Sequence, residues 1–188
     1  PHEGTALYFG IRPQFGTNCC NLFRIRRGDI ERGFAEADLV VEETFRTPAI
    51  QHVAMEPHAA LACWEDGRLT VWSGTQTPFN TRQILAGIFG LPVEAVRVIV
   101  PPIGGSYGCK VFPRIEPQAA LLAYVTGRPV KFVLRRDEEF VTLIRHATVV
   151  TIRLGLKRDG RITAKEVRAY WNTGAYADCG PDVVRKGG

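Results

Sequence analysis

The stretch Val100-Pro101-Pro102-Ile103-Gly104-Gly105-Ser106-Tyr107-Gly108-Cys109-Lys110-Val111 decides how this chain is expected to fold. It follows a β-branched run at 96–100, has three glycines within five residues, and precedes a long helical pattern. This order predicts a strand, a glycine turn and a helix. In such an arrangement backbone N–H groups can approach an anionic or polar ligand, and the helix N-terminus adds partial positive charge. An ordinary tight turn is the alternative that the stretch alone leaves open.

A β-hairpin is expected ahead of this stretch, because the apolar runs 59–64 and 69–73 flank an Asp-Gly turn at 66–67. The segment before the hairpin carries His52, Glu56 and His58, which are residue types that bind metals. Pro57 interrupts any helix that would align them. Ordinary hydrogen-bonding roles are therefore favoured over a metal site.

A helix is expected between the hairpin and the stretch. Thr77 predicts its N-cap, Pro78 its first residue and Gly90 its end. The expected apolar face consists of Ile84, Leu85, Ile88 and Phe89. Gln76 is thereby placed at a strand-to-helix junction.

The remaining segments predict two helices, a helical turn, two strands and a second hairpin. The expected elements are a helix over 30–37 capped by Asp29, a strand over 39–46, a helix over 118–126 ended by Gly127, a buried strand over 130–134, a helical turn through 141 capped by Asp137, and a hairpin of 148–156 with 162–171. Residues 172–178 are expected to form a glycine-containing turn. The fold class is α+β: mixed sheets with hairpins and at least two packed helices.

Length and composition predict a globular protein. The chain has 188 residues, 45% of them hydrophobic, which suffices for one large domain or two small ones. No window approaches about 20 uninterrupted apolar residues, and the start lacks the layout of a signal peptide. A cytoplasmic protein without membrane insertion is expected.

Cysteine and charge patterns argue against two classes of site. The five cysteines, Cys19, Cys20, Cys63, Cys109 and Cys179, form no C-x-x-C pair, so neither a zinc nor an iron–sulfur site is indicated. The formal net charge is +5, and its one compact basic cluster lies at 24–27. A solvated face explains that cluster better than nucleic-acid binding does.

Six motifs, taken in order, resemble one family. They are Met55-Glu56-Pro57, Gly74-Thr75-Gln76-Thr77-Pro78, Gly104 to Lys110, Gly127-Arg128-Pro129-Val130, Arg135-Arg136-Asp137-Glu138-Glu139 and Asn172-Thr173-Gly174-Ala175-Tyr176. In order and spacing they are similar to the large, molybdenum-binding subunit of the xanthine dehydrogenase, aldehyde oxidase and carbon monoxide dehydrogenase family. The resemblance runs from about Arg24 to Tyr176. It implies that 23–178 is part of a larger molybdopterin-binding domain. Residues 1–22 lack sustained periodicity and are expected to form an extended lead-in, and 179–188 is expected to be a truncated tail without a capped element.

The resemblance implies a molybdenum hydroxylase, which inserts a water-derived oxygen at an electron-poor carbon of an aldehyde or heteroaromatic compound. The implied cofactor is a molybdenum-pyranopterin, in the cytosine dinucleotide form common in bacteria. FAD and [2Fe-2S] clusters are expected on partner chains or domains, and the cysteine pattern agrees with that division. The implied partners are the rest of the large subunit, an FAD subunit and an iron–sulfur subunit.

Site roles follow from the motifs. Gln76 matches the family glutamine whose side-chain amide donates to an oxygen ligand of molybdenum. Gly105, Ser106, Tyr107 and Gly108 match the segment whose backbone amides contact the cofactor, with tyrosine where phenylalanine is usual. Lys110 matches the lysine after this loop, as either a ligand contact or a structural ion-pair partner. No direct metal ligand is implied.

Departures from the family pattern limit the expected chemistry. Purine-oxidising members have a glutamate where this chain has Val111, in the substrate pocket, so a purine substrate is disfavoured. Cys109 adds an oxidisable thiol near the expected centre. The family's catalytic glutamate lies C-terminal to the residues present, and Glu116, Glu138 and Glu139 do not match it. The chain alone is therefore expected to have no catalytic base and no activity.

Two other readings compete with this one. A non-catalytic scaffold or a dinucleotide-binding module would keep the fold and lack the downstream glutamate. A nucleic-acid-binding protein would bind polyanions with steep salt dependence and would have no use for Gln76.

Overall fold

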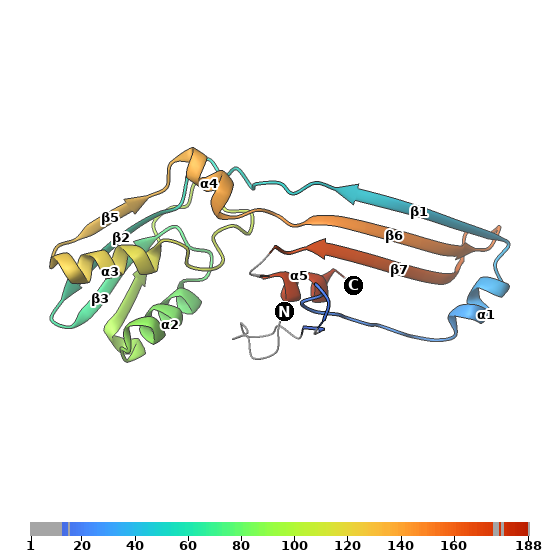
Figure 1. Ribbon diagram of the computed structural model, residues 1–188, viewed down its shortest axis with the longest axis horizontal. Helices are drawn as coiled ribbons and strands as arrows, with labels where there is room; N and C mark the ends of the chain where they lie inside the picture. The colour runs from blue at the N-terminus through green and yellow to red at the C-terminus, as the bar shows by residue number, and fades with distance from the viewer. Residues whose placement is uncertain (1–12, 15, 175–176, 178, 188) are drawn as a thin grey trace. The chain divides into compact units, whose positions relative to one another are not determined.

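The computed structural model describes residues 13–14, 16–174, 177 and 179–187 (Figure 1). The chain divides into two compact units, one formed by Gln51–Arg145 and the other by the segments Pro1–Ile50 and His146–Gly188. The predicted lead-in falls largely on residues outside the described set, as do Ala175, Tyr176 and Asp178 of the predicted turn. Within the described residues, no helix combines the length and the apolar character needed to span a bilayer.

The unit Gln51–Arg145 is built on a four-stranded mixed sheet in the order β4-β3-β2-β5. Its strands are β2 (Ala59–Glu65), β3 (Arg68–Ser73), β4 (Val96–Ile99) and β5 (Val130–Val133). The predicted Asp-Gly hairpin is confirmed, with Ala60 opposite Ser73 and Glu65 opposite Arg68. β4 runs parallel to β3, which requires a crossover connection, and helix α2 supplies it.

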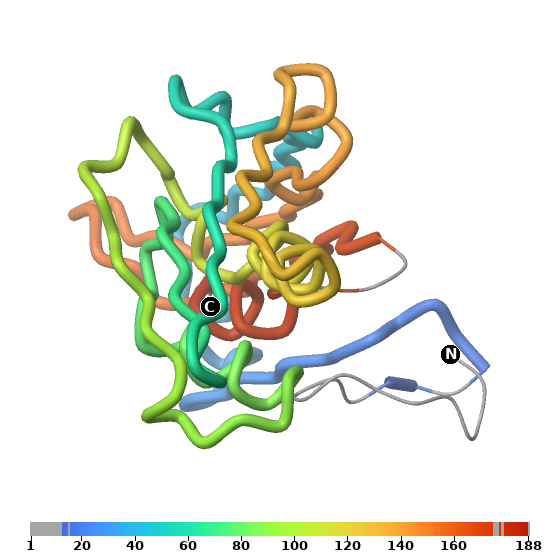
Figure 2. Tube along the Cα trace, turned by 90° about the vertical axis from the view of Figure 1, so that its left-hand side faces the viewer, coloured from blue at the N-terminus to red at the C-terminus, as the bar shows by residue number. Residues whose placement is uncertain are grey.

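Two helices, α2 (Pro78–Phe89) and α3 (Glu116–Thr126), pack on this sheet. Figure 2 views α3 (yellow) along its axis. Fully buried Leu69 and Val71 of the sheet meet Leu85 of α2 in the core. The face of α3 toward the sheet consists of alanines, Ala119, Ala120 and Ala123, so the helix can lie close to the strands. Both helices end as predicted, at Gly90 and Gly127 with left-handed φ.

The glycine stretch connects β4 to α3, but it does not lead directly into the helix. α3 begins at Glu116, well beyond Lys110, and the buried Glu116 carboxylate accepts hydrogen bonds from Ser73 Oγ (2.6 Å) and from the N–H of Arg114 (2.8 Å). The N-terminal end of α3 is thus neutralised by a carboxylate of its own first turn. The expectation that this helix terminus adds positive charge beside the loop is wrong.

The other unit contains an antiparallel sheet in the order β1-β6-β7. Its strands are β1 (Leu39–Thr47), β6 (Ala147–Leu156) and β7 (Ile162–Asn172), so the predicted long hairpin is confirmed. Helix α1 (Ile30–Ala35) begins at Asp29, whose carboxylate accepts from the N–H of Arg32 as predicted. A short helix, α5 (Gly180–Lys186), lies in the segment for which no capped element was expected.

Three local predictions are wrong, and one is right in position only. β5 is an edge strand whose residues alternate between half-buried and exposed, not a buried strand. Helix α4 (Arg136–Thr142) takes Arg135 as its N-cap, with the Glu138 carboxylate accepting from the Arg135 N–H (2.7 Å), so Asp137 does not cap it. Thr77 is the N-cap residue of α2 as predicted, but its hydroxyl donates to the Val111 carbonyl and makes no capping hydrogen bond. Ile88 is exposed, and Thr81 and Ala86 are buried on that helix instead.

Two helical glycines have opposite surroundings and give a paired prediction. A Cβ on Gly33 of α1 would lie 2.5 Å from the Thr163 carbonyl oxygen, whereas a Cβ on Gly87 of α2 would meet nothing within 4 Å. We expect Gly33→Ala to lower the free energy of unfolding by about 1–3 kcal/mol and Gly87→Ala to raise it by about 0.5–1 kcal/mol. Urea unfolding measures both, and equal effects of the two substitutions would contradict the packing of α1 on β7.

Candidate functional site

The loop at 104–110 turns sharply through three residues with positive φ. They are Gly105 (φ 102°), Tyr107 (φ 51°) and Gly108 (φ 99°), and the turn is closed by the Cys109 N–H donating to the Ser106 carbonyl (2.8 Å). Glycine suits this conformation, but for Tyr107 it costs on the order of 1–3 kcal/mol. Tyr107 also keeps 75% of its surface exposed. A bulky, strained and exposed residue in the middle of the loop needs strong supports on either side.

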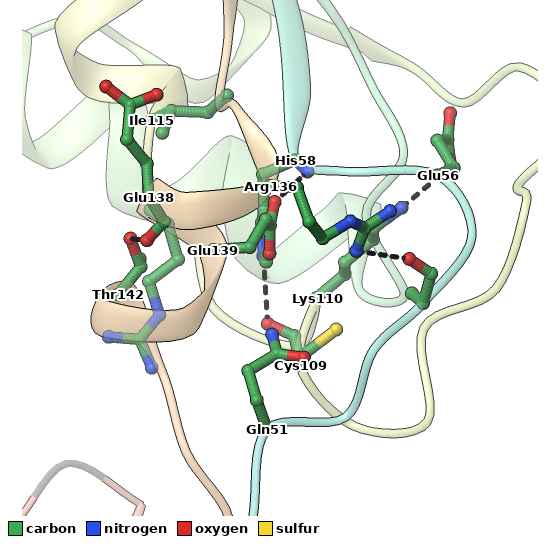
Figure 3. Close-up of polar contacts among 12 residues, drawn as sticks. Gln51, Glu56, His58, Cys109, Lys110, Ile115, Arg136, Glu138, Glu139 and Thr142 are labelled. Atoms are coloured by element: carbon green, nitrogen blue, oxygen red, sulfur yellow. Dashed lines mark hydrogen bonds and ion pairs between the residues drawn. The ribbon is translucent and has the colours of Figure 1, made fainter.

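Glu56 is the first support, because its carboxylate holds both ends of the loop. Figure 3 shows Glu56 and Lys110, which form the contact at one of these ends. Glu56 Oε2 accepts from the Gly104 N–H (3.0 Å) and from Lys110 Nζ (2.7 Å). The Glu56 N–H in turn donates to the Gly104 carbonyl (3.0 Å). A Cβ on Gly104 would lie 2.7 Å from the Glu56 Cβ, so only glycine allows this close approach.

The Glu56–Lys110 pair answers the question that the sequence left open for Lys110. Only 3% of the Lys110 side chain is exposed, against 30% of the Glu56 side chain, so the ammonium depends on this carboxylate for its counter-charge. Burial alone would raise the pKa of Glu56, but the hydrogen bonds from Lys110 and Gly104, together with the Lys110 charge, lower it below 4.5. Lys110 is a structural ion-pair partner in this unit.

His58 and Glu139 form the second support. His58 Nδ1 lies 2.9 and 3.0 Å from the two Glu139 carboxylate oxygens, and His58 Nε2 lies 3.1 Å from the Cys109 carbonyl oxygen, to which it donates (Figure 3). The His58 backbone N–H also donates to Glu139. Both side chains are buried, so the pair is shielded from water. α4 is thereby connected to the C-terminal part of the loop.

Gln76 lies at the junction after β3, and its backbone and side chain are both held by the loop. Its N–H donates to the Lys110 carbonyl (2.8 Å), and its Oε1 accepts from the Gly108 N–H (3.1 Å). Because Gly108 supplies a donor, the amide oxygen of Gln76 must face the loop, and the Nε2 donors are directed away from it. Across the described residues, no acceptor receives those donors.

The loop also presents backbone donors. Among the residues that the structure describes, no acceptor receives a hydrogen bond from the backbone N–H of Gly105, Ser106 or Tyr107. These three backbone amides, together with the side-chain amide of Gln76 at the junction after β3, form a set of neutral donors, called the donor set below. A ligand rich in anionic or polar acceptors matches such a set without requiring a charged side chain.

Cys109 is shielded beneath the loop. Its residue surface is 1% exposed, and burial raises the pKa of its thiol, so little thiolate is present near neutral pH. The oxidisable thiol anticipated at this position is therefore protected from reagents in solvent.

The remaining candidate residues have clear local surroundings. Val111 follows Lys110 and is half-buried, and its carbonyl accepts a hydrogen bond from the Thr77 hydroxyl. Glu116 binds Ser73, Glu138 caps α4, and Glu139 binds His58, so each of these carboxylates has a structural partner.

The structure brings Gln76, Gly105, Ser106, Tyr107 and Gly108 together, since Gln76 binds the loop directly. What the sequence did not show was the partner of His58. Glu139 lies 81 residues away, and only the docking of α4 makes them neighbours. Hydrogen-bonding roles are confirmed for Glu56 and His58, and within the described ranges no group of three His, Cys, Asp or Glu side chains could hold a metal ion.

Comparison with known proteins gives consistent matches. The sequence matches the model of the molybdopterin cofactor-binding domain over residues 11–188. A probable xanthine dehydrogenase subunit of Bacillus subtilis (strain 168) is 42% identical over 159 residues, which are 84% of this chain and 21% of that protein. The nicotinate dehydrogenase large molybdopterin subunit of Eubacterium barkeri is 36% identical over 172 residues, or 90% of this chain and 40% of that protein.

Solved structures show the same relationship. The aldehyde oxidoreductase from Desulfovibrio gigas matches with a TM-score of 0.77 and 26% identity, over 85% of this chain and 18% of that one. A carbon monoxide dehydrogenase from Oligotropha carboxidovorans matches with a TM-score of 0.68 and 29% identity, over 74% of this chain and 18% of that one. The chain spans only about a fifth of the length of these structures and of the Bacillus relative.

Lys110 is more deeply buried than Glu56, so replacing one or the other should change the free energy of unfolding by different amounts. Glu56→Gln leaves a buried ammonium without a counter-charge, and we expect it to lower the free energy of unfolding by about 3 kcal/mol. Lys110→Met leaves a carboxylate that water reaches, and we expect a loss of about 1 kcal/mol. Urea unfolding of both single variants and of the double variant measures the coupling. Additive losses would contradict a direct interaction.

The lowered pKa of Glu56 predicts an acid-labile contribution to stability. The ionised carboxylate stabilises the fold above pH 4.5, and this contribution is lost as the pH falls below 4.5 through the lowered pKa. We expect the difference in free energy of unfolding between the native chain and Glu56→Gln to shrink over that range. A difference that stays constant down to the acid limit would contradict the proposed role of ionised Glu56.

Proposed function

This chain belongs to the molybdopterin cofactor-binding domain family, and from that premise we propose that it supplies one wall of the molybdenum-cofactor site in a larger oxidoreductase of the molybdenum hydroxylase type. The observation that carries the proposal is the set of neutral donors around Gly108. Within the described residues, the N–H groups of Gly105, Ser106 and Tyr107 stand free beside the Gln76 amide, whose oxygen the Gly108 N–H holds.

Each part of this donor set has a distinct role in the proposal. When bound, the pyranopterin cofactor supplies two-electron molybdenum chemistry for hydroxylation with oxygen from water. The amides of Gly105, Ser106 and Tyr107 bind acceptor atoms of the cofactor. Gly108 orients Gln76, so that the Gln76 Nε2 donors face the cofactor while adding no charge. Glu56 and Lys110 keep the ends of the loop in place.

The catalytic base is supplied by another part of the larger protein. In this chain Glu116, Glu138 and Glu139 are engaged in structural hydrogen bonds. The chain spans 21% of the Bacillus relative, so there is ample room for the base elsewhere. The 188-residue chain alone is proposed to be inactive, and hydroxylation of an aldehyde or heteroaromatic compound by the isolated chain with an artificial electron acceptor would overturn that part.

Val111 carries the proposal about substrate. Its side chain cannot accept or donate a hydrogen bond, so a purine would lose a charge-assisted partner there. An aldehyde or a heteroaromatic compound other than a purine is the proposed substrate class, and the proteins named for nicotinate and aldehyde oxidation agree with it. The Bacillus relative is named for xanthine, so the two substrate classes need a direct test. In the assembled enzyme, we expect Val111→Glu to raise the activity with a purine relative to that with an aldehyde. An unchanged ratio of the two activities would contradict the role of Val111.

The assembly and cofactor form are proposed from the family. We propose the cytosine dinucleotide form of the cofactor, FAD and [2Fe-2S] clusters on partner chains or domains, and a cytoplasmic location. A non-catalytic scaffold or dinucleotide-binding module is not favoured, because the matched relatives are named as oxidoreductase subunits.

Replacement of Gln76 tests the proposal directly. In the assembled oxidoreductase, we expect Gln76→Ala to lower kcat/KM by about 10–100-fold, the usual effect of losing an outer-shell hydrogen bond at a metal site. Gln118→Ala, at an exposed position of α3, is the matched control and should leave kcat/KM unchanged. An equal effect of both substitutions, or no effect of the first, would exclude the proposed role of Gln76.

A further inference from the structure

His52 lies next to the donor set and takes no part in the supports described above. Its ring atom Nε2 is 4.0 Å from the position that a Cβ on Gly108 would occupy. Gly108 is the residue whose N–H holds Gln76 (3.1 Å). His52, from the segment before β2, therefore lies beside the same residue of the loop as Gln76, which follows β3.

The two ring nitrogens of His52 have different surroundings. Nδ1 is buried and has no hydrogen-bond partner among the described residues, whereas Nε2 is directed toward Gly108. A proton on Nδ1 would create a buried N–H without an acceptor, which is costly. The favoured tautomer is thus neutral, with its proton on Nε2.

Burial is the main reason why the neutral ring is favoured. It lowers the pKa of His52, and electrostatic interactions with Arg145 and His58 lower it further. Apart from these two groups, no titratable or charged side chain contributes to the shift of His52 among the described residues. His52 consequently stays an uncharged donor, as Gln76 does.

The segment that carries His52 is held in one conformation. Both terminal nitrogens of the Arg136 guanidinium donate to it, Nη1 to the Ala54 carbonyl (2.7 Å) and Nη2 to the Met55 carbonyl (2.7 Å). The Gln51 side chain accepts from the Val53 N–H. A ring at the start of such a restrained segment can hold a donor in a fixed direction.

We propose that His52 is a positioning residue of the cofactor site, whose Nε2–H donates to an acceptor atom of the bound cofactor beside Gln76. This rests on the proposed function, since the acceptor belongs to the cofactor. His52 and Gln76 then flank Gly108 with two neutral donors. In the described part of the chain the buried Nδ1 has no group with which to exchange a proton, so His52 orients a ligand and does not act as an acid or base.

The first test concerns the ring itself and needs no cofactor. In the ¹⁵N-labelled chain, nitrogen chemical shifts of the four histidines report tautomer and charge, and His52→Gln identifies the His52 signals. We expect the neutral Nε2–H tautomer near neutral pH, with protonation at a lower pH than an exposed histidine requires. A proton on Nδ1, or a positively charged ring near neutral pH, would overturn the inference.

The second test separates the donor from the shape of the ring. In the assembled oxidoreductase, His52→Leu fills the space without a donor, while His52→Gln restores an N–H near the Nε2 position. We expect His52→Leu to lower molybdenum and pterin retention after dialysis by about three- to tenfold, the effect of one neutral hydrogen bond, and His52→Gln to restore most of it. Unfolding midpoints check that both variants fold. If His52→Leu does not fold, the nitrogen spectra of the native chain still test the inference.

The outcomes distinguish this inference from the proposed function. If the native oxidoreductase holds no pterin, the proposed function fails and this role of His52 fails with it. If the native protein holds pterin and His52→Leu holds as much, only the inference about His52 fails. If His52→Gln loses as much molybdenum and pterin as His52→Leu, the inference also fails, because the packing of the ring and not a donated hydrogen bond explains the effect of His52.

Discussion

The Glu56 carboxylate is the contact on which the candidate site depends, because one oxygen holds both ends of the loop. It accepts from the Gly104 N–H and from the buried Lys110 ammonium. In this loop Gly105 and Gly108 adopt positive φ at no steric cost, whereas Tyr107 stores conformational strain there. The Glu56 contacts hold the loop in this conformation without consuming the amides of Gly105, Ser106 and Tyr107 in internal hydrogen bonds.

The supports of the loop illustrate how charged groups can serve a site without entering it. Lys110, Glu56, His58 and Glu139 are all charged or titratable side chains, and each one binds another protein group. Among the described residues of the loop and those beside it, the groups without a hydrogen-bond partner are neutral donors: the amides of Gly105, Ser106 and Tyr107, the Gln76 Nε2 group and the proposed Nε2–H of His52. A metal cofactor surrounded by neutral donors keeps the electrostatics of its own ligands, because no fixed charge from these groups competes with them. Buried ion pairs contribute little net stability, and their value here is geometric.

Most elements of the fold could be predicted from local sequence. The Asp-Gly turn at 66–67 determined the first hairpin, and Pro78 with Gly90 determined the bounds of α2, because these residues act through backbone conformation alone. Predictions failed where another partner competes. Asp137 is a good capping residue, but Arg135 takes the N-cap position and Glu138 accepts from the Arg135 N–H. Thr77 is the N-cap residue of α2 as predicted, but its hydroxyl donates to the Val111 carbonyl instead of to the helix. The edge position of β5 likewise depends on strand order, which no local pattern encodes.

The sequence by itself determined the family, the order along the chain of the strands and α-helices before α5, and the candidate set Gln76, Gly105, Ser106, Tyr107 and Gly108, because motif order and turn-forming residues are readable without coordinates. Tertiary structure alone decided what those residues face. It paired Lys110 with Glu56 across 54 positions and His58 with Glu139 across 81, and it placed His52 against Gly108. Such pairings follow from how β2, α4 and the loop pack, and packing depends on the shapes of all three together. The glycine stretch is therefore a loop whose composition permits its conformation, and whose neighbours hold it there.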